Sequence, residues 1–330
     1  MKLAIIGTSL IVETFIDAVR QCPEIELAAV YSRTEENARR FAEHFGIAGT
    51  YTNLETLAAA PEVDGVYIAS PNACHFEQSL LMLRGGKHVL CEKPATTCEA
   101  ELVELLRVAK EHGVVFLEAS KHLFSPGIRL LRERLPEIGP VRRVALAYHQ
   151  YSSRYDDFKR GIVHNVFTPE LGGGALLDIG VYCVQMMVAL FGAPRGLVSM
   201  SMPLHTGVDG QGAAVAKYDG FLVELSYSKI IQAVGPNEIV GEAGSLVFEH
   251  LSRIEQIQVV MRNGETRQVS CHSLPNQMTY EVQAFYEMAH NPEQAARYHE
   301  YSRMALAVMD EIKRQQGLKV PTPSSQAFSC

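Results

Sequence analysis

The chain opens on Leu3-Ala4-Ile5-Ile6-Gly7-Thr8-Ser9-Leu10-Ile11-Val12, four apolar residues, a glycine turn and the start of a segment with helical periodicity. A short, wholly apolar run that stops at glycine is typical of a buried strand. The same alternation of strand and helix continues through predicted strands at 27–31, 63–69, 88–91 and 114–117. Strands that are apolar on both faces predict a parallel sheet covered by helices, which is a doubly wound Rossmann-type domain.

The pattern changes near Ser120. Predicted strands then recur at 141–151, 197–202, 212–218, 221–229, 245–249, 254–262 and 265–270, and helices are expected at 278–290 and 292–315. Asp219-Gly220 and Asn263-Gly264 predict tight turns between antiparallel strands. We therefore expect an α/β dinucleotide-binding domain over 1–120 and an α+β substrate and oligomerisation domain over 121–330, with a mainly antiparallel open sheet. Residues 321–330 are predicted to be poorly ordered coil.

The composition limits the class of function. A net charge of -7 argues against nucleic-acid binding and suits a cytoplasmic protein. We see no apolar run long enough for a membrane span, which takes about 20 residues. The 7 cysteines show no C-x-x-C pair, so reduced thiols are expected. The histidines show no metal-ligand spacing, so no metal is predicted.

The loop after the first strand occupies the place of a phosphate-binding G-x-G-x-x-G motif. Only Gly7 is kept, because Ser9 and Val12 stand at the second and third glycine positions. The helix N-terminus still offers free N–H groups to an anion, and Ser9 has a hydroxyl to donate. The loop is either a plain strand-to-helix turn or a cofactor site, and the candidate binding residues are Gly7, Thr8, Ser9, Leu10 and Ile11.

The end of the second strand bears on the choice of cofactor. Enzymes that use NAD normally place an acid there, whereas this chain has Ser32 and Arg33, with Arg39 and Arg40 in the following helix. Arginine gives phosphate a planar, bidentate partner, so NADP(H) is favoured over NAD(H). The alternative for Arg39 and Arg40 is an ordinary solvated helix face.

Three later segments carry a resemblance to a known family. They are Val66-Tyr67-Ile68-Ala69-Ser70-Pro71-Asn72 with His75, then Gly85-Gly86-Lys87-His88-Val89-Leu90-Cys91-Glu92-Lys93-Pro94, and Gly172-Gly173-Gly174-Ala175-Leu176-Leu177-Asp178-Ile179-Gly180-Val181-Tyr182. Together these resemble the Gfo/Idh/MocA oxidoreductases. Tyr182, where many members carry histidine, resembles the branch of the dimeric dihydrodiol dehydrogenases.

The resemblance implies a role for each motif. Ser70, Pro71, Asn72 and His75 would line the cofactor, and His75 could instead cap the helix that follows. Glu92 and Pro94 would hold the turn that presents Lys93 to the reacting hydroxyl or carbonyl. Asp178 would bind or orient the substrate, and Tyr182 would donate or accept the proton.

The chemistry of hydride transfer suits this set of residues. Reduction of a carbonyl needs a proton at oxygen as hydride reaches carbon, and a free tyrosine with a pKa of about 10 is a poor base at neutral pH. A lysine ammonium nearby would lower that pKa, or lysine itself could act if burial lowered its own pKa. The sequence leaves open which of Lys93 and Tyr182 is the immediate proton donor. The spacing of Asp178 and Tyr182 predicts one shared helix face.

Several polar residues are candidate substrate contacts: Lys121, Arg154, His164, Asn165 and Phe167. Lys121 stands where similar enzymes often carry tryptophan, and it suggests an anionic or strongly polar substrate. The chain is expected to be an NAD(P)-dependent dehydrogenase or reductase acting on a sugar, polyol or related hydroxy or carbonyl compound. The alternatives are a non-catalytic nicotinamide-nucleotide-binding regulator, or a lyase or hydrolase with a tightly held nicotinamide. An open sheet needs cover, which predicts a homodimer or higher homo-oligomer.

Overall fold

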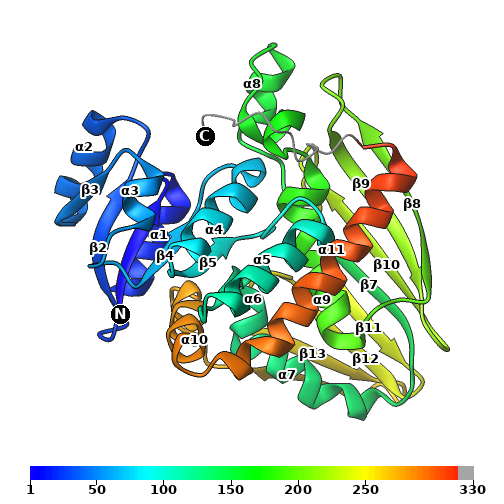
Figure 1. Cartoon of the computed structure of the whole chain (residues 1–330). Helices are drawn as coiled ribbons and strands as arrows, with labels where there is room; N and C mark the ends of the chain where they lie inside the picture. The colour runs from blue at the N-terminus through cyan, green and yellow to red at the C-terminus, as the bar shows by residue number, and fades with distance from the viewer. Residues whose placement is uncertain (319–330) are drawn as a thin grey trace. The chain divides into compact units, whose positions relative to one another are not determined.

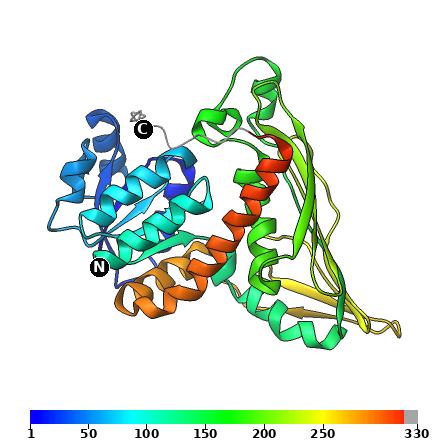
Figure 2. The ribbon, with the colours of Figure 1, turned by 45° about the vertical axis from the view of Figure 1, so that its right-hand side comes forward.

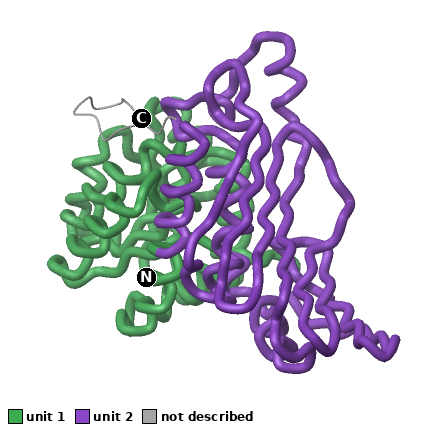
Figure 3. The backbone as a smooth tube through the Cα atoms, turned by 90° about the vertical axis from the view of Figure 1, so that its right-hand side faces the viewer, with its two compact units in different colours: residues 1–120, 275–303, 322–330 green, residues 121–274, 304–321 purple. Residues whose placement is uncertain are grey.

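The computed structural model describes residues 1–318 and divides them into two compact units (Figure 3). The first unit contains 1–120 and Pro275–Arg303, and the second contains Lys121–Leu274 and the helix residues from Met304 onward. The return of 275–303 to the first unit differs from the sequence prediction, which gave every residue after 120 to the second domain. The coil predicted for 321–330 lies outside the described residues.

The first unit is built on a six-stranded sheet in the order β3-β2-β1-β4-β5-β6, in which every pair is parallel. Its strands are β1 (Lys2–Ile6), β2 (Glu26–Tyr31), β3 (Gly49–Tyr51), β4 (Gly65–Ile68), β5 (His88–Glu92) and β6 (Phe116–Ala119). This is the strand order of dinucleotide-binding folds, and it confirms the predicted Rossmann-type sheet. The short strand β3 was not predicted.

Helices connect these strands (Figure 1). They are α1 (Leu10–Val19), α2 (Glu35–Phe45), α3 (Leu54–Ala58), the 3-10 turn η1 (Asn72–Cys74), α4 (His75–Arg84) and α5 (Glu99–Glu111). The later helix α10 (Met278–His290) packs against α1, and Asn276 Nδ2 donates to the Thr14 carbonyl oxygen at 2.7 Å. This packing is why 275–303 belongs to the first unit. The short turn η6 (Pro292–Ala295) leads into α11 (Ala296–Gln316), which belongs to the second unit from Met304 onward.

The second unit contains an eight-stranded sheet in the order β14-β13-β12-β11-β7-β10-β9-β8. Its strands are β7 (Val141–His149), β8 (Gly196–Pro203), β9 (Asp209–Lys217), β10 (Leu222–Ser228), β11 (Asn237–Gly241), β12 (Gly244–Phe248), β13 (Gln256–Met261) and β14 (Thr266–Ser270). Only β7 and β10 pair in parallel, so the carboxyl ends of these two strands meet at one edge. The predicted hairpins are confirmed, because β9 pairs antiparallel with β10 and β13 with β14.

The remaining helices of the second unit are α6 (Lys121–Phe124), α7 (Pro126–Arg134), α8 (Tyr155–Lys159) and α9 (Val181–Phe191), with short turns at η2 (Leu135–Ile138), η3 (Asn165–Phe167), η4 (Pro169–Leu171) and the π-helical turn η5 (Leu176–Gly180). Figure 2 shows α9 and the end of α11 on one face of this sheet. Alternate residues of β8 are exposed on the opposite face, so among the described residues that face is open.

One expectation from composition needs correction. The segment Pro169–Phe191 is long and apolar enough to cross a membrane, because it contains an 18-residue window with a mean hydropathy of 1.8. In the fold, however, 78% of that window is buried. A buried core helix passes the same test, because its whole circumference contacts protein. Of the cysteines, Cys22, Cys91, Cys98, Cys183 and Cys271 are free thiols.

Candidate active site

The glycine turn after β1 leaves the N-terminus of α1 accessible. Gly7 has a φ of 122°, and a Cβ placed on it would lie 2.7 Å from the Ala69 carbonyl oxygen. No side chain fits there, so this first glycine of the motif is structurally required. Ser9, Leu10 and Ile11 are exposed, and the first turn of a helix has N–H groups without intrahelical acceptors. Val12, at the third glycine position, is fully buried, so its side chain is not exposed at this helix end. The turn and its free N–H groups therefore fit a bound pyrophosphate.

A hydrogen-bond network joins this turn to the end of β2. Asn37 Nδ2 donates to Thr8 Oγ1 at 3.0 Å and to Ser32 Oγ at 2.8 Å, a link that the sequence did not reveal. Arg33 is exposed and has no carboxylate partner within 1–318. Arg39, by contrast, is paired with Glu35. Arg40 is exposed too and donates to the Asn37 side-chain oxygen at 2.7 Å, which is not a carboxylate. Arg33, directly after β2, is therefore the predicted arginine beside Ser32 whose charge is available to a phosphate.

The loop Ser70-Pro71-Asn72 follows β4 and is tied to the loop after β5. His75 Nδ1 lies 2.9 Å from the Pro94 carbonyl oxygen, and its Nε2 lies 2.9 Å from the Ser70 carbonyl oxygen. Only 1% of His75 is exposed, and burial lowers its pKa although both carbonyl oxygens act in the opposite direction. The ring thus connects the two predicted cofactor loops from inside the fold.

The turn Glu92-Lys93-Pro94 is fixed by a hydrogen bond from a buried tyrosine. Tyr67 OH donates to Glu92 Oε1 at 2.7 Å, and the other carboxylate oxygen accepts from the Lys93 backbone N–H at 3.2 Å. Phe15 stacks on Tyr67 with ring centroids 3.5 Å apart. Burial raises the pKa of Tyr67 well above its usual value, so its hydroxyl remains a donor. The Lys93–Pro94 peptide is cis, and Lys93 is partly buried.

A second carboxylate supports the same turn. Glu118 on β6 accepts from the Ala95 backbone N–H at 2.8 Å and from Ser302 Oγ at 2.5 Å. Glu118 is 5% exposed, so its charge is compensated inside the fold by these donors. The sequence did not predict this role, because the contact joins residues far apart in the chain.

In the second unit, the glycine run leads into the π-helical turn that carries Asp178. Leu176 N–H donates to Asp209 Oδ2 at 2.8 Å, and a side chain at Gly174 would collide with the same carboxylate. Burial raises the pKa of Asp209 to about 6. A Cβ at Gly180 would lie 2.9 Å from the Tyr227 ring, so the glycines let this segment approach β9 and β10 closely.

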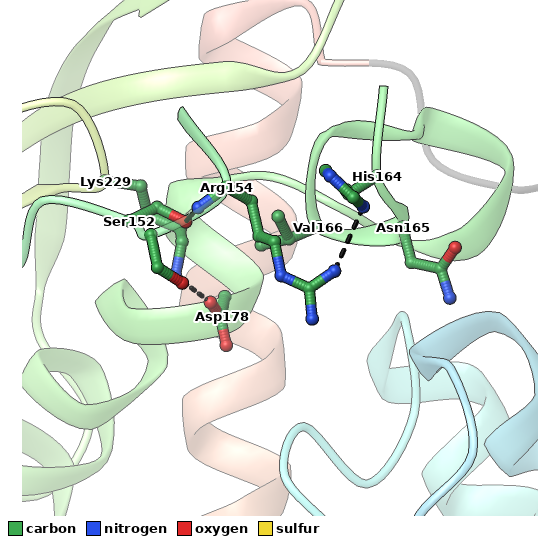
Figure 4. Close-up of a pocket in the computed structure, with 8 residues that line it drawn as sticks. Ser152, Arg154, His164, Asn165, Val166, Asp178 and Lys229 are labelled. Carbon is green, nitrogen blue, oxygen red and sulfur yellow. Dashed lines mark hydrogen bonds and ion pairs between the residues drawn. The ribbon is translucent and has the colours of Figure 1, made fainter. Parts of the chain in front are cut away.

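A pocket of about 400 Å³ lies beside Asp178 (Figure 4). It is lined by Ser152, Ser153, Arg154, His164, Asn165, Val166, Asp178 and Lys229. Arg154 Nη1 lies 3.0 Å from His164 Nδ1, which must accept because a guanidinium only donates. His164 Nε2–H therefore donates to Asp157 Oδ2 at 2.7 Å, and this bond holds the pKa of Asp157 below its usual range.

Tyr182 lies in an aromatic cluster. Its ring centroid is 5.0 Å from that of His122 and 5.4 Å from that of Tyr148. Tyr182 does not line the pocket around Asp178. The shared helix face predicted for Asp178 and Tyr182 assumed α-helical spacing, and the π-helical turn at Leu176–Gly180 alters that spacing.

The structure thus brings together Arg154, His164, Asn165 and Asp178. It does not add Phe167, which is fully buried in a cluster with Phe158 and Val208. The proposed substrate contact at Phe167 is therefore wrong, because its ring packs in a core, 4.8 Å from that of Phe158. Lys121 is partly buried at the start of α6 and does not line the pocket.

Sequence reasoning missed four residues that line the pocket: Lys229, Ser152, Ser153 and Val166. Lys229 is the charged one among them. It forms an ion pair with Asp178 and is 5% exposed. The available signal was a lysine at the carboxyl end of a strand next to the predicted substrate loop. Among residues 1–318, no group of three or more His, Cys, Asp or Glu side chains is arranged to hold a metal ion.

The first unit is, by its strand order and its glycine turn, a dinucleotide-binding domain. Residues 1–120 match the model of an oxidoreductase family with an NAD-binding Rossmann fold, and residues 129–247 match the GFO/IDH/MocA C-terminal domain. The chain therefore belongs to the Gfo/Idh/MocA family of NAD(P)-dependent dehydrogenases and reductases, as the motifs around Lys93 and Asp178 predicted.

Relatives of known activity span nearly the whole chain. The chain is 40% identical to the scyllo-inositol 2-dehydrogenase (NADP(+)) IolU of Bacillus subtilis (strain 168), covering 97% of this chain and 98% of that protein. It is 31% identical to trans-1,2-dihydrobenzene-1,2-diol dehydrogenase of Mus musculus, covering 81% and 79%. The structure of KijD10, a 3-ketoreductase from Actinomadura kijaniata in complex with NADP and TDP-benzene, is similar with a TM-score of 0.87, 25% identity and coverage of 96% and 98%.

Proposed function

We propose that the chain is an NADP-preferring oxidoreductase of a sugar or polyol, with Lys93 and Tyr182 in proton transfer. The observation that carries this proposal is the pocket around Asp178, whose lining is almost wholly made of hydrogen-bonding side chains and contains no aromatic ring apart from His164. Such a lining suits a substrate with many hydroxyls. The inositol dehydrogenase and the ketoreductase similar to this chain support the same class of substrate.

The nicotinamide cofactor supplies the hydride when it is bound. Gly7, Ser9 and the N-terminus of α1 would hold its pyrophosphate, and Ser70, Pro71 and Asn72 would line its ribose and nicotinamide side. The protein then has to manage one proton at the substrate oxygen. Lys93, fixed by Glu92, and Tyr182 are the groups proposed for that transfer, while Asp178 orients the substrate.

The preference for NADP rests on Arg33, which follows Ser32 directly and has no acidic partner within 1–318. Fluorescence titration with NADPH and NADH measures it directly, and the chain has no tryptophan to contribute background emission. Arg33→Ala should weaken NADPH binding by about 10- to 100-fold, the value of a hydrogen bond between charged groups, and leave NADH binding unchanged. The matched control is Arg39→Ala, which removes an arginine already paired with Glu35. Equal effects of the two variants would contradict the role of Arg33.

Activity is tested by a screen of sugars and polyols with NADP(+), followed by substitution of the proton-transfer residues. Lys93→Met and Tyr182→Phe should each lower kcat by about 100-fold or more while NADPH still binds. Binding without turnover on any polyol or sugar, unchanged by Lys93→Met, would instead support a nucleotide-binding regulator.

We also propose a cytoplasmic homodimer or larger homo-oligomer. The open face of the second sheet exposes Val198, Met200 and Met202 on β8, with Val215 beside Val198 on β9. A patch of this kind commonly marks a protein interface. Light scattering should give a mass above that of one chain, and Met200→Glu should reduce it.

A further inference from the structure

Lys229 is a buried lysine whose hydrogen-bonding capacity is only partly used. It follows β10 directly, and its backbone is fixed on both sides, donating to the Gly210 carbonyl oxygen and accepting from Ser152 N–H, each at 2.9 Å. Its Nζ pairs with Asp178 Oδ2, and within residues 1–318 it has no second partner. An ammonium has three donors, so N–H groups remain for a further acceptor.

The pocket is where that acceptor would lie. Both Lys229 and Asp178 line it, and Asp178 has 32% of its side chain exposed whereas Lys229 has 7%. A buried charge is costly unless its remaining hydrogen bonds are satisfied. The pair therefore offers the pocket a fixed donor next to a fixed acceptor, one hydrogen-bond length apart, without net charge.

Two oxygens on neighbouring carbon atoms complement this arrangement, because they are also separated by about one hydrogen-bond length. We propose that Lys229 is a specificity-determining residue that, together with Asp178, selects substrates with vicinal oxygens. Asp178 accepts from one hydroxyl, and Lys229 donates to the oxygen on the adjacent carbon. This inference rests on the proposed polyol activity and deepens it, since it predicts a vicinal diol or α-hydroxy ketone rather than an isolated alcohol.

Two isomeric probes isolate the spacing of the oxygens: trans-1,2-cyclohexanediol and trans-1,3-cyclohexanediol. Their binding to the NADP(+) complex is measured by calorimetry, and their oxidation by NADPH formation, for the full chain and for Lys229→Met and Lys229→Arg. The control is Lys313→Met, because Lys313 is also 5% exposed and paired with an aspartate, Asp310, but does not line the pocket.

The wild type and Lys313→Met should favour the 1,2-diol by about 10- to 100-fold, as expected for one hydrogen bond to a charged group. Lys229→Met should reduce this preference to less than about 3-fold, and Lys229→Arg should restore part of it. The proposal is overturned if Lys229→Met keeps the preference for the 1,2-diol, or if Lys313→Met loses that preference to the same extent as Lys229→Met. It is also overturned if the wild type binds neither diol at a concentration of about 100 millimolar. Binding with the expected preference but without NADPH formation on any substrate would refute the oxidoreductase activity and leave the role of Lys229 supported.

Discussion

Substitution of Tyr67 by phenylalanine tests how the turn that presents Lys93 is held. The change removes the hydroxyl that donates to Glu92 Oε1 at 2.7 Å and keeps the ring that stacks on Phe15. A hydrogen bond to a charged group contributes about 1.5–3 kcal/mol, so we expect Tyr67→Phe to lower the free energy of unfolding by about 2 kcal/mol. Because Glu92 also accepts from Lys93 N–H, kcat should fall as well.

The assay is urea unfolding followed by circular dichroism, with NADPH formation measured in parallel. The matched control is Tyr51→Phe, since Tyr51 also donates to a glutamate, Glu62, but that carboxylate lies at the surface. A hydrogen bond that is exposed to water contributes little to the free energy of unfolding, so Tyr51→Phe should unfold like the wild type. The reasoning is refuted if Tyr67→Phe is as stable and as active as Tyr51→Phe.

Two further predictions concern the ends of the site helices. Gly7→Ala should weaken NADPH binding by about 10-fold or more, because its Cβ would meet the Ala69 carbonyl oxygen, whereas Gly46→Ala, also at positive φ but with open space around it, should leave the fluorescence titration unchanged. Asp209 has a pKa raised from 3.8 to about 6, so the folded chain retains a proton that the unfolded chain loses, and stability falls as pH rises through that window. The free energy of unfolding of Asp209→Asn, relative to that of the wild type, should therefore rise by about 2 kcal/mol between pH ~4 and pH ~7 in urea unfolding. A difference that does not change with pH would contradict the assignment.

The sequence predicted most of what depends on short-range pattern. The parallel strands were visible as apolar runs, and the hairpins at Asp219-Gly220 and Asn263-Gly264 were visible because their turns demand those residues. The helix at Met278–His290 was predicted with its observed bounds. Strand β3 was missed because Gly49–Tyr51 is too short to show a period.

The site was predictable only where a motif carried it. Lys93, Asp178 and Tyr182 were identified from family motifs, but Lys229, Asn37 and Glu118 act through contacts with distant parts of the chain. Phe167 illustrates the opposite error: an aromatic residue in a polar loop looked like a substrate contact, and it packs in a small core. The π-helical turn before α9 was equally invisible, since no residue type requires it.

The return of Pro275–Arg303 to the first unit has a consequence for protein engineering. A gene fragment that stops at codon 120 would omit α10 and with it the bond from Asn276 to Thr14. It would also lose Ser302, which donates to Glu118. Such a fragment should aggregate, and a chimaera that exchanges the cofactor half between relatives needs a second crossover that carries this distal segment along with the first 120 residues.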